Sequence, residues 1–506
     1  MGGMESAGFL SVPALVEAAG ERFRGRPALL TRDSETTFDE LANRTAFAAG
    51  AIRRAGITPG ERVLLVAANS PATVIAWLAA IHAGVLPAAV NPELTLRELD
   101  YLGGDLEAAA VIGDESRREV AREIADGVHA AHHGLDDLFR EGETMAAHAA
   151  DPLSPAAIVY TSGTTSRPKG VQVRHAAYTE TGLSFPHWIG LGEAERLWAC
   201  LPLFHINAQA YSLMTALRHG YGLALSEKFH ASTFWRDAAA LGVTEVNVIG
   251  AMLTFLERQP AESWVESPLH TIYAAPVPTP EVRDQLEQRF RVRITGGYGM
   301  SENTFGCAES PTSRDKAGSI GRPRQPASGA FVNELRVRRE DGGEAQAGED
   351  GELCFRNPLL TPGYWNAPDV TARTLVDGWL RTGDLGHVDR DGDVFLSGRL
   401  KEMIRRRGEN IAPAEVEDAL LAHPAVEAVA VFGVPSDVTE EEVVAAVVAK
   451  PGRQLDVAEL QEAARARLAA YKVPAKIHIL DELPLTPTMR VAKDELRRRF
   501  SDGAPS

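Results

Sequence analysis

The sequence predicts an α/β protein with two domains of different texture. We expect a large N-terminal domain of layered sheets and helices, with a small β-barrel-like region, over residues 1–398 and a small mobile α+β domain over residues 399–506. Three observations lead to this prediction. The first half alternates short apolar runs with helical patterns, turn clusters separate short strands from about residue 334, and a compact mixture of strands and helices follows residue 398.

The first half contains strand-like runs that are almost entirely apolar. Residues 62–67 and 156–160 are the clearest, and the second run ends in a loop rich in Gly, Ser and Thr. Runs without polar alternation are typical of strands that helices cover on both faces, as in parallel sheets. Residues 71–90 carry no Asp, Glu, Lys or Arg, but Gly84 and Pro87 interrupt them. They therefore predict a buried helix and strand rather than a membrane span.

Turn signals punctuate the second half. Asp and Gly cluster at residues 341–343 and 391–393, which predicts short antiparallel strands. Further strands are expected at residues 426–434 and 443–448. Asp456 is placed to cap a helix whose apolar residues, at spacings of three and four, are Val457, Leu460, Ala464, Leu468 and Tyr471. The change of pattern at residues 398–401 marks the expected domain boundary.

Composition limits the classes of function. The chain of 506 residues has 52 Lys and Arg against 69 Asp and Glu, a formal net charge of −17, which argues against bulk binding to nucleic acid or an anionic membrane. The three cysteines, Cys200, Cys307 and Cys354, are far apart and odd in number, so they indicate neither a disulfide framework nor a paired-cysteine metal site. With no signal-peptide pattern near the N-terminus, we expect a cytoplasmic protein.

The strongest local signal is a loop that crowds hydroxyls, glycine and lysine after a predicted strand. It reads Tyr-Thr-Ser-Gly-Thr-Thr-Ser-Arg-Pro-Lys-Gly over residues 160–170. The candidate phosphate-binding residues are Thr161, Ser162, Gly163, Thr164, Thr165 and Lys169. Glycine lets the backbone approach a ligand, and N–H groups, hydroxyls and an ammonium can then hold phosphate oxygens. A Walker loop is excluded because Gly170 follows the lysine, and the competing interpretation is a solvated turn.

This loop resembles the phosphate loop of the adenylate-forming superfamily, which contains acyl-CoA ligases, peptide-synthetase adenylation domains and luciferases. Further motifs of that superfamily follow in order: Pro-Leu-Phe-His-Ile-Asn at 202–207, Gly-Gly-Tyr-Gly-Met-Ser-Glu at 296–302, Trp-Leu-Arg-Thr-Gly-Asp-Leu at 379–385 and Gly-Arg-Leu-Lys-Glu at 398–402. The resemblance covers nearly the whole chain and is nearest to acyl-CoA ligases. It implies an acid–thiol ligase that uses ATP, Mg²⁺ and CoA and passes through an acyl-adenylate.

The resemblance assigns roles to the polar residues of these motifs. Tyr298 stacks on adenine and Asp384 accepts hydrogen bonds from both ribose hydroxyls, which suits an aromatic face and an acceptor-only carboxylate. Glu302 binds Mg²⁺ together with Thr164, since a hard cation prefers oxygen ligands. The other nucleotide-binding residues that it implies are Gly299, Ser301 and Arg399. The competing interpretation of residues 296–302 is a Gly-rich strand end with a solvated glutamate.

An acyl pocket, a hinge and a CoA tunnel are implied in the same way. The residues of the acyl pocket are His205, Gly250, Ala275, Gly297 and Met300. The small residues among them would leave room for a bulky or long apolar acid, and without the resemblance a lone histidine beside Phe204 would be a core residue. Lys401 lies at the hinge about which the C-terminal domain rotates between half-reactions, and Gly408 lines the pantetheine tunnel.

The last motif of the superfamily, Pro-x-Thr-x-x-Gly-Lys-x-x-Lys, is altered in this chain. Residues 484–493 read Pro-Leu-Thr-Pro-Thr-Met-Arg-Val-Ala-Lys, so Met489 and Arg490 stand in place of the Gly and the first Lys. In the superfamily that lysine bridges the attacking carboxylate and the α-phosphate during adenylation. Arg490 keeps the charge, but a planar, forked guanidinium does not replace a compact ammonium in a tight site.

These observations predict a split activity, with adenylation weak or absent and thioester formation from an acyl-adenylate and CoA retained. A separate adenylating enzyme would then supply the adenylate. Three alternatives stay open. Arg490 performs the task of the lysine in an ordinary two-step carboxylic acid–CoA ligase, the protein loads an aryl or amino acid onto a carrier protein, or it binds an acyl-adenylate without catalysis.

Overall fold

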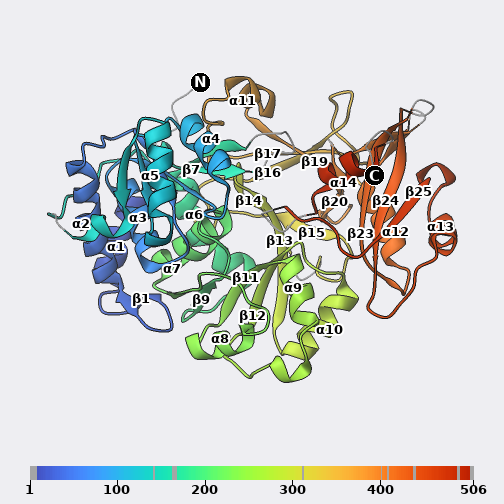
Figure 1. Ribbon diagram of the computed structural model, residues 1–506, viewed down its shortest axis with the longest axis horizontal. Helices are drawn as coiled ribbons and strands as arrows, with labels where there is room; N and C mark the ends of the chain where they lie inside the picture. Colours follow the sequence, from blue (N-terminus) through green and yellow to red (C-terminus); the bar gives the residue numbers. More distant parts are fainter. Residues whose placement is uncertain are drawn as a thin grey trace. The chain divides into compact units, whose positions relative to one another are not determined.

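The computed structural model describes residues 8–140, 143–161, 168–309, 313–400, 402–406, 409–436, 440–486 and 491–501. The chain forms two compact units (Figure 1). The large unit comprises Met1–Leu335 and Cys354–Arg381, and the small unit comprises Arg336–Leu353 and Thr382–Ser506.

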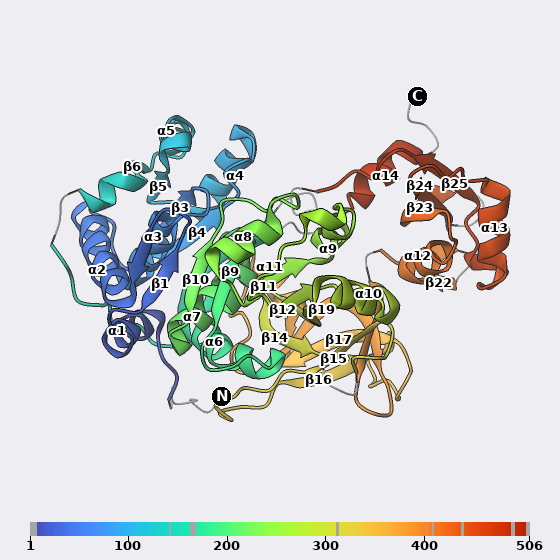
Figure 2. The same cartoon turned by 90° about the horizontal axis from the view of Figure 1, so that it is seen from below.

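The large unit contains a parallel sheet with helices on both faces. Its strands lie in the order β4 (Leu86–Val90), β3 (Arg62–Val66), β5 (Ala110–Gly113) and β6 (Ala131–Gly134). Alternate side chains of β3 point to opposite faces. Val63 and Leu65 pack with α2 (Phe38–Arg54) and α3 (Pro71–His82), whereas Leu64 and Val66 pack with α4 (Leu96–Leu106) and α5 (Arg118–Gly127). In Figure 2 the two pairs of helices flank these strands.

Helix α3 shows why the uncharged segment folds as it does. Ser70 caps its first turn by accepting a hydrogen bond from the Thr73 N–H, and Pro71 occupies the first helical position, where no N–H is needed. All residues from Thr73 to His82 are buried. Protein surrounds the helix on every side, and this explains why the segment carries no charged residue. Within the described part of the chain, no helix is both long and apolar enough to cross a membrane.

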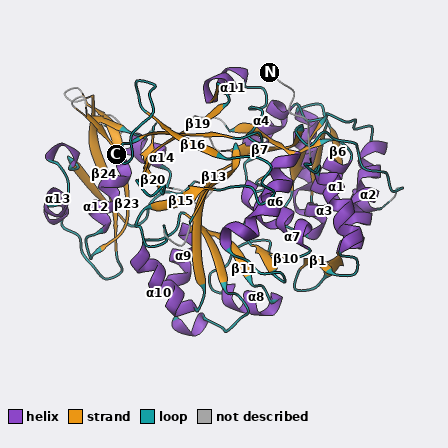
Figure 3. Ribbon diagram, turned by 180° about the vertical axis from the view of Figure 1, so that it is seen from behind, coloured by secondary structure: helices purple, strands orange, loops and turns teal. Residues whose placement is uncertain are grey.

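A second sheet of the large unit has six consecutive parallel strands. They lie in the order β1 (Pro27–Leu30), β10 (Gly222–Leu225), β9 (Arg196–Ala199), β11 (Glu245–Ile249), β12 (Thr271–Ala275) and β13 (Arg293–Met300). Helices α8 (Phe234–Leu241) and α10 (Pro280–Phe290) contribute to the core on one face, and Figure 3 shows these strands in orange beside the purple helices. The antiparallel strands β14 (Asn303–Ala308) and β15 (Ser319–Pro323) continue the sheet. Because these six strands are parallel, their carboxyl ends meet at one edge.

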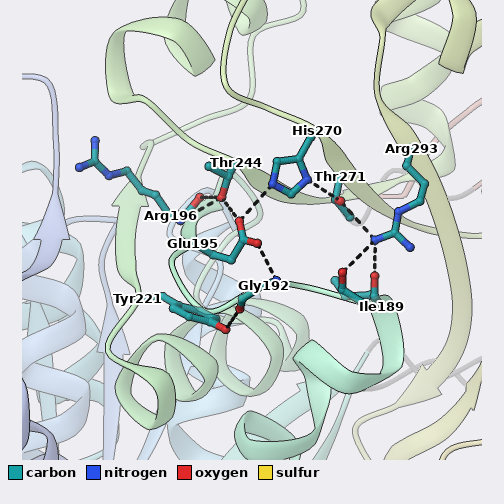
Figure 4. A network of polar contacts seen from close by, with 10 residues as sticks. Ile189, Gly192, Glu195, Arg196, Tyr221, Thr244, His270, Thr271 and Arg293 are labelled. Carbon is teal, nitrogen blue, oxygen red and sulfur yellow. Dashed lines mark hydrogen bonds and ion pairs between the residues drawn. The ribbon is translucent and has the colours of Figure 1, made fainter.

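A network of polar contacts closes the amino ends of β9, β11, β12 and β13 (Figure 4). The Glu195 carboxylate accepts hydrogen bonds from a backbone N–H at 2.8 Å and from the Thr244 hydroxyl, and it lies 3.2 Å from His270 Nε2. The Thr271 hydroxyl lies 2.9 Å from His270 Nδ1 and accepts from Arg293 Nη2 at 3.3 Å. We call these five residues the amino-end network.

A separate hairpin carries the predicted phosphate loop. Strands β7 (Pro155–Thr161) and β8 (Lys169–Arg174) pair antiparallel, and Thr161 lies opposite Lys169 at the end of the ladder. The residues between 161 and 168 lie outside the described part of the chain. The hairpin therefore fixes where the loop leaves and re-enters the large unit.

The small unit has a strand pair with helices on both faces. Strands β23 (Val426–Ser436) and β24 (Glu440–Ala449) pair antiparallel, and β25 (Lys476–Leu480) is parallel to β24. Alternate side chains separate two cores. Val431 and Val443 pack with α12 (Pro413–Leu421) and α13 (Val457–Arg465), whereas Phe432 and Val444 pack with α14 (Lys493–Phe500).

The structure confirms the predicted fold class and most of the predicted elements. The expected strands at residues 62–67, 156–160, 426–434 and 443–448 are β3, β7, β23 and β24, and all three cysteines are free and buried. Asp456 caps α13 by accepting from the N–H groups of Ala458 and Glu459, but the helix ends at Arg465. Strand β7 lies in an antiparallel hairpin, because an apolar run shows burial and not the direction of its partner.

Candidate functional site

Three side chains of separate motifs meet in the large unit. The Tyr364 hydroxyl donates a hydrogen bond to Glu302 Oε1 at 2.7 Å, and Lys169 Nζ lies 5.8 Å from the centroid of the Tyr364 ring. Glu302 is only 7% exposed, so its carboxylate is largely withdrawn from water. Burial first, and then the neighbouring carboxylate, raise the pKa of Tyr364 well above its ordinary value, which keeps the hydroxyl a donor.

The segment that carries Tyr364 is bound edge-on to β8. The Thr361 hydroxyl donates to the Gln172 carbonyl at 2.7 Å, and the Trp365 N–H donates to the Gly170 carbonyl at 2.7 Å. A Cβ at Gly170 would come within 2.8 Å of Ile158 and 3.3 Å of Trp365, so only glycine allows this approach. Lys169 begins the same strand. The backbone hydrogen bonds between this strand and the segment of Tyr364 therefore hold the Tyr364 ring near Lys169.

Tyr298 lies in β13, and Ser301 directly follows that strand and precedes Glu302. The Tyr298 ring is nearly parallel to that of Phe355, with an interplanar angle of 18° and centroids 6.2 Å apart. The Tyr298 side chain is half-buried, whereas Ser301 is 8% exposed. The Thr361 N–H donates to the Glu302 carbonyl at 2.9 Å, which ties this turn to the Tyr364 segment.

The small unit brings together the two predicted nucleotide-binding residues that belong to it. Asp384 in β19 (Trp379–Val388) lies opposite Arg399 in β20 (Val394–Arg399), and Asp384 Oδ1 is 3.0 Å from Arg399 Nε. The Asp384 N–H donates to the Thr382 hydroxyl at 3.0 Å. Asp384 is 5% exposed, so the pair holds a carboxylate in place in a largely dehydrated position.

Four of the five residues predicted for the acyl pocket lie at the carboxyl ends of the parallel strands. Gly250 begins the helix after β11, Ala275 ends β12, and Gly297 and Met300 lie in the last part of β13. His205 precedes the π-helix η3 (Asn207–Leu213), and its ring lies 4.5 Å from that of Phe204. The carboxyl edge of a parallel sheet is where ligands bind in open α/β folds.

Several predicted residues lie outside the described part of the chain. They are Ser162, Gly163, Thr164, Thr165, Lys401, Gly408, Met489 and Arg490. The residues around the altered motif are described: Leu485 and Val491 form a bridge, and the Ala492 N–H donates to the Pro484 carbonyl at 2.8 Å. Lys493 Nζ lies 2.7 Å from Glu417 Oε1 and 3.4 Å from Glu402 Oε2, so the second lysine of the motif is held by ion pairs within the small unit.

Tyr364 was not among the predicted site residues, although the sequence contained a signal for it. It stands in Pro-Gly-Tyr-Trp at residues 362–365, a run in which a tyrosine hydroxyl adjoins residues typical of turns. Nothing in the run indicates its partner, since Glu302 is 62 residues away in sequence.

Comparison with known proteins adds independent information. Residues 16–365 match the profile described as AMP-binding enzyme, and residues 415–490 match the profile described as AMP-binding enzyme C-terminal domain. A sulfoacetate–CoA ligase of Cupriavidus necator is 32% identical over 503 residues, which cover 96% of this chain and 97% of that protein. A feruloyl-CoA synthase of an Amycolatopsis species is 33% identical over 478 residues, which cover 92% of this chain and 94% of that protein.

Two solved structures are similar over almost the full length. ATP-bound MatB from Rhodopseudomonas palustris has a TM-score of 0.89 at 26% identity and covers 97% of this chain and 99% of its own. The o-succinylbenzoate CoA synthetase of Bacillus subtilis, in complex with its acyl-adenylate intermediate, has a TM-score of 0.85 at 26% identity and covers 97% and 98%.

Proposed function

This chain belongs to the family of AMP-binding enzymes, and on that premise we propose that it is an acid–CoA ligase with unequal half-reactions. It forms an acyl-CoA thioester from an acyl-adenylate and CoA, and its ATP-dependent adenylation is weak or absent. The first part of the proposal is supported by full-length similarity to acid–CoA ligases and by the cluster of Lys169, Tyr364 and Glu302. The second part rests on one observation, Arg490 where the superfamily has lysine.

In the proposed reaction the large unit holds the phosphates. Lys169 supplies a cation at the end of the hairpin, and Glu302 is the carboxylate that would hold Mg²⁺ with Thr164. A glutamate fits this ion, because Mg²⁺ prefers hard oxygen ligands and the carboxylate of Glu302 is largely withdrawn from water. Bound there, the ion would neutralise charge on the phosphates.

Tyr298 and Asp384 are the residues that we propose for binding the nucleoside. Tyr298 offers a half-buried aromatic ring for adenine. Asp384, oriented by Arg399, offers two carboxylate oxygens to the ribose hydroxyls. Gly408 and the hinge at Lys401 complete the proposal on resemblance alone, as do Ser162, Gly163 and Thr165 of the phosphate loop.

The proposal separates the half-reactions because they need different cations. Adenylation brings a carboxylate to the α-phosphate, so a positioned ammonium lowers the repulsion as the bond forms. One preorganised contact of this kind contributes on the order of 10²–10³ in rate. A guanidinium is broader and its charge is spread, and Met489 adds bulk where the superfamily has glycine. Attack of CoA on a preformed adenylate does not use this group.

Separate assays of the two half-reactions test the proposal. ATP–pyrophosphate exchange with a panel of acids reports adenylation, and release of AMP and thioester from synthetic acyl-adenylates reports the second step. We expect slow exchange and fast thioester formation. Arg490→Lys should raise exchange on the order of 10²-fold with little effect on the second step, and Met489→Gly added to it should raise exchange further.

Arg498→Lys is the matched control, since it makes the same change at an exposed position of α14 and should leave both rates unchanged. Rapid exchange by the unaltered protein would show an ordinary two-step ligase. Tight binding of adenylate without turnover would show a binding protein. If exchange is slow as proposed, a separate adenylating enzyme supplies the adenylate in the cell.

The comparisons favour no single acid. The similar proteins are named for acids as different as sulfoacetate, ferulate and long-chain fatty acids. Loading of a carrier protein stays a second candidate, since peptide-synthetase adenylation domains belong to the same superfamily. It would be shown by acyl transfer to a phosphopantetheinyl protein in preference to free CoA.

A further inference from the structure

The large unit buries an arginine that has no carboxylate partner among the described residues. Arg324 directly follows β15 and is 2% exposed. Its Nη1 donates to the Tyr211 hydroxyl at 3.0 Å and to the Thr304 carbonyl at 3.4 Å, and its Nη2 donates to the Tyr273 hydroxyl. Its Nε is buried and has no hydrogen-bond partner in the described structure.

The surroundings of Arg324 stabilise a cation without neutralising it. The guanidinium carbon lies 4.8 Å from the centroid of the Trp188 ring, 5.2 Å from that of Tyr211 and 5.5 Å from that of Tyr273. Aromatic faces attract a cation through their quadrupole and carry no net charge. Burial raises the pKa of Tyr273 to about 12, so this hydroxyl stays neutral at ordinary pH. A buried charge left unpaired is unfavourable, which makes this arrangement unusual.

Another arginine of the same unit shows how the fold treats a buried guanidinium. Arg283 in α10 is 1% exposed, and its Nη1 lies 2.7 Å from Glu309 Oε1. Glu309 accepts a second hydrogen bond from the Gly296 N–H at 2.7 Å. Arg283 therefore has its counter-charge built in, whereas Arg324 has none within the described residues.

The position of Arg324 links it to the acyl pocket. A Cβ on Gly297 would overlap Arg324 Nη2 and lie 2.7 Å from the Tyr273 hydroxyl, and a Cβ on Gly299 would lie 2.6 Å from the Tyr211 hydroxyl. These glycines flank the predicted adenine-stacking tyrosine at the carboxyl end of β13. Tyr211 belongs to the π-helix η3, which begins two residues after His205, and such helices are frequent at functional sites.

We propose that Arg324, with the hydroxyl of Tyr273, forms an anion-binding end of the acyl pocket, and that the substrate is a short acid with a second anionic group. That group is a carboxylate or a sulfonate, distal to the carboxyl group that reacts. The inference rests on the proposed function, because it needs Gly297 to border the acyl group.

The free hydrogen-bonding capacity of the guanidinium suits this ligand. The Nε–H and one hydrogen of Nη2 lie on the same edge of a guanidinium, which is the geometry that grips an anion through two parallel hydrogen bonds. The Nε of Arg324 is the atom left without a partner. A bound anion would supply both the missing acceptor and the missing counter-charge.

The small residues of the pocket do not require a bulky acid. A Cβ on Gly250 would lie 3.2 Å from the Pro276 carbonyl oxygen, and one on Gly297 would lie 2.6 Å from the Cys307 carbonyl oxygen. Protein atoms therefore already lie next to both glycines. The expectation of a long apolar acid has no support at these two positions.

Stable analogues of the acyl-adenylate test the substrate class directly. The probes are acyl-sulfamoyl adenosines whose acyl chains have the same length and end in carboxylate, sulfonate or methyl, and the measurement is calorimetric affinity for the full-length protein. We expect the two charged probes to bind on the order of 100-fold more tightly than the methyl probe. The relative affinities of carboxylate and sulfonate identify the natural anion.

Variants assign the difference to Arg324. Arg324→Met should reduce the preference for the charged probes to about 1, Arg324→Lys should keep part of it, and Arg236→Met, the same change at an exposed position, should leave it unchanged. Thermal unfolding of each variant identifies any that does not fold, and the comparison of probes on the unaltered protein still decides in that case.

The outcomes separate the two proposals. Equal affinity for the charged and methyl probes would overturn the inference and leave the ligase proposal standing. Binding of none of the probes would overturn both, since adenosine itself would then not be recognised. A charge preference that survives Arg324→Met would show that another cation binds the second anion, and it would also overturn the inference.

Discussion

The two ends of the large parallel sheet differ in how their polar groups are satisfied. At the amino ends, the five residues of the amino-end network bond to one another and to backbone groups, with Thr271 linking His270 to Arg293 (Figure 4). At the carboxyl ends, Arg324 is buried with a free Nε and has no carboxylate partner among the described residues. A network that satisfies itself contributes stability, whereas buried groups with spare capacity can bind a ligand.

One residue at the amino ends departs from this contrast. Both oxygens of Glu245 are fully buried and have no hydrogen-bond partner among the described residues. Burial raises the pKa of Glu245 well above its ordinary value, so the side chain is held as a neutral acid. A neutral carboxylic acid needs no counter-charge, which distinguishes it from Arg324.

The largest expected effect is on catalysis at the carboxyl ends. Glu302→Gln keeps the shape of the side chain and removes its charge, so the phosphates lose the carboxylate proposed to hold Mg²⁺. ATP–pyrophosphate exchange, measured in the Arg490→Lys background where it is expected to be fast, should fall on the order of 10²–10³-fold, while the midpoint of thermal unfolding changes little. Steady-state kinetics over a range of Mg²⁺ concentrations measures this. Unchanged exchange at every concentration would remove Glu302 from the site.

At the amino ends we expect a loss of stability without a loss of activity. Glu195→Gln weakens the hydrogen bonds from Thr244 and from a backbone N–H to a carboxylate that is 6% exposed. The free energy of unfolding should fall by about 2 kcal/mol, with turnover unchanged. Urea denaturation followed by circular dichroism measures it, and Glu193→Gln, at an exposed position nearby, should cost less than about 0.5 kcal/mol. A loss of activity without a loss of stability would contradict the division between the two ends.

The sequence predicted some of the site residues and missed others. Lys169, Glu302 and Asp384 could be assigned because each stands in a motif whose residue types and order resemble a known superfamily. Tyr364 could not be linked to Glu302, and Arg324 carried no signal at all, because its burial arises only where Trp188, Tyr211 and Tyr273 converge from distant parts of the chain. Contacts between distant residues are set by packing, and a local pattern does not contain them.

The fold was easier to predict than the pairing of its strands. Apolar runs located β3, β7, β23 and β24, since burial leaves a direct mark on composition. The antiparallel partner of β7 was missed, because the direction of a neighbouring strand is decided by the connection between them. The amino-end network was missed for the same reason as Arg324: it joins the starts of four strands that lie far apart in sequence.

The smallest effect is expected from Tyr364→Phe. This variant tests whether the hydrogen bond from Tyr364 orients the Glu302 carboxylate. The hydroxyl donates one hydrogen bond at 2.7 Å to a carboxylate, and the ring that faces Lys169 is kept in the variant. Loss of one such bond, with the carboxylate still able to bind an ion, should lower kcat/KM for ATP–pyrophosphate exchange, again in the Arg490→Lys background, about 10-fold. The effect should grow as Mg²⁺ is lowered, because a less oriented Glu302 would bind the ion more weakly.

Titration of activity with Mg²⁺ for the variant and the unaltered protein measures this, and Tyr471→Phe, in the small unit, is the matched control. A 10-fold loss that stays the same at every Mg²⁺ concentration would place Tyr364 against the substrate instead, and the carboxyl ends would then contain one more group in direct contact with it.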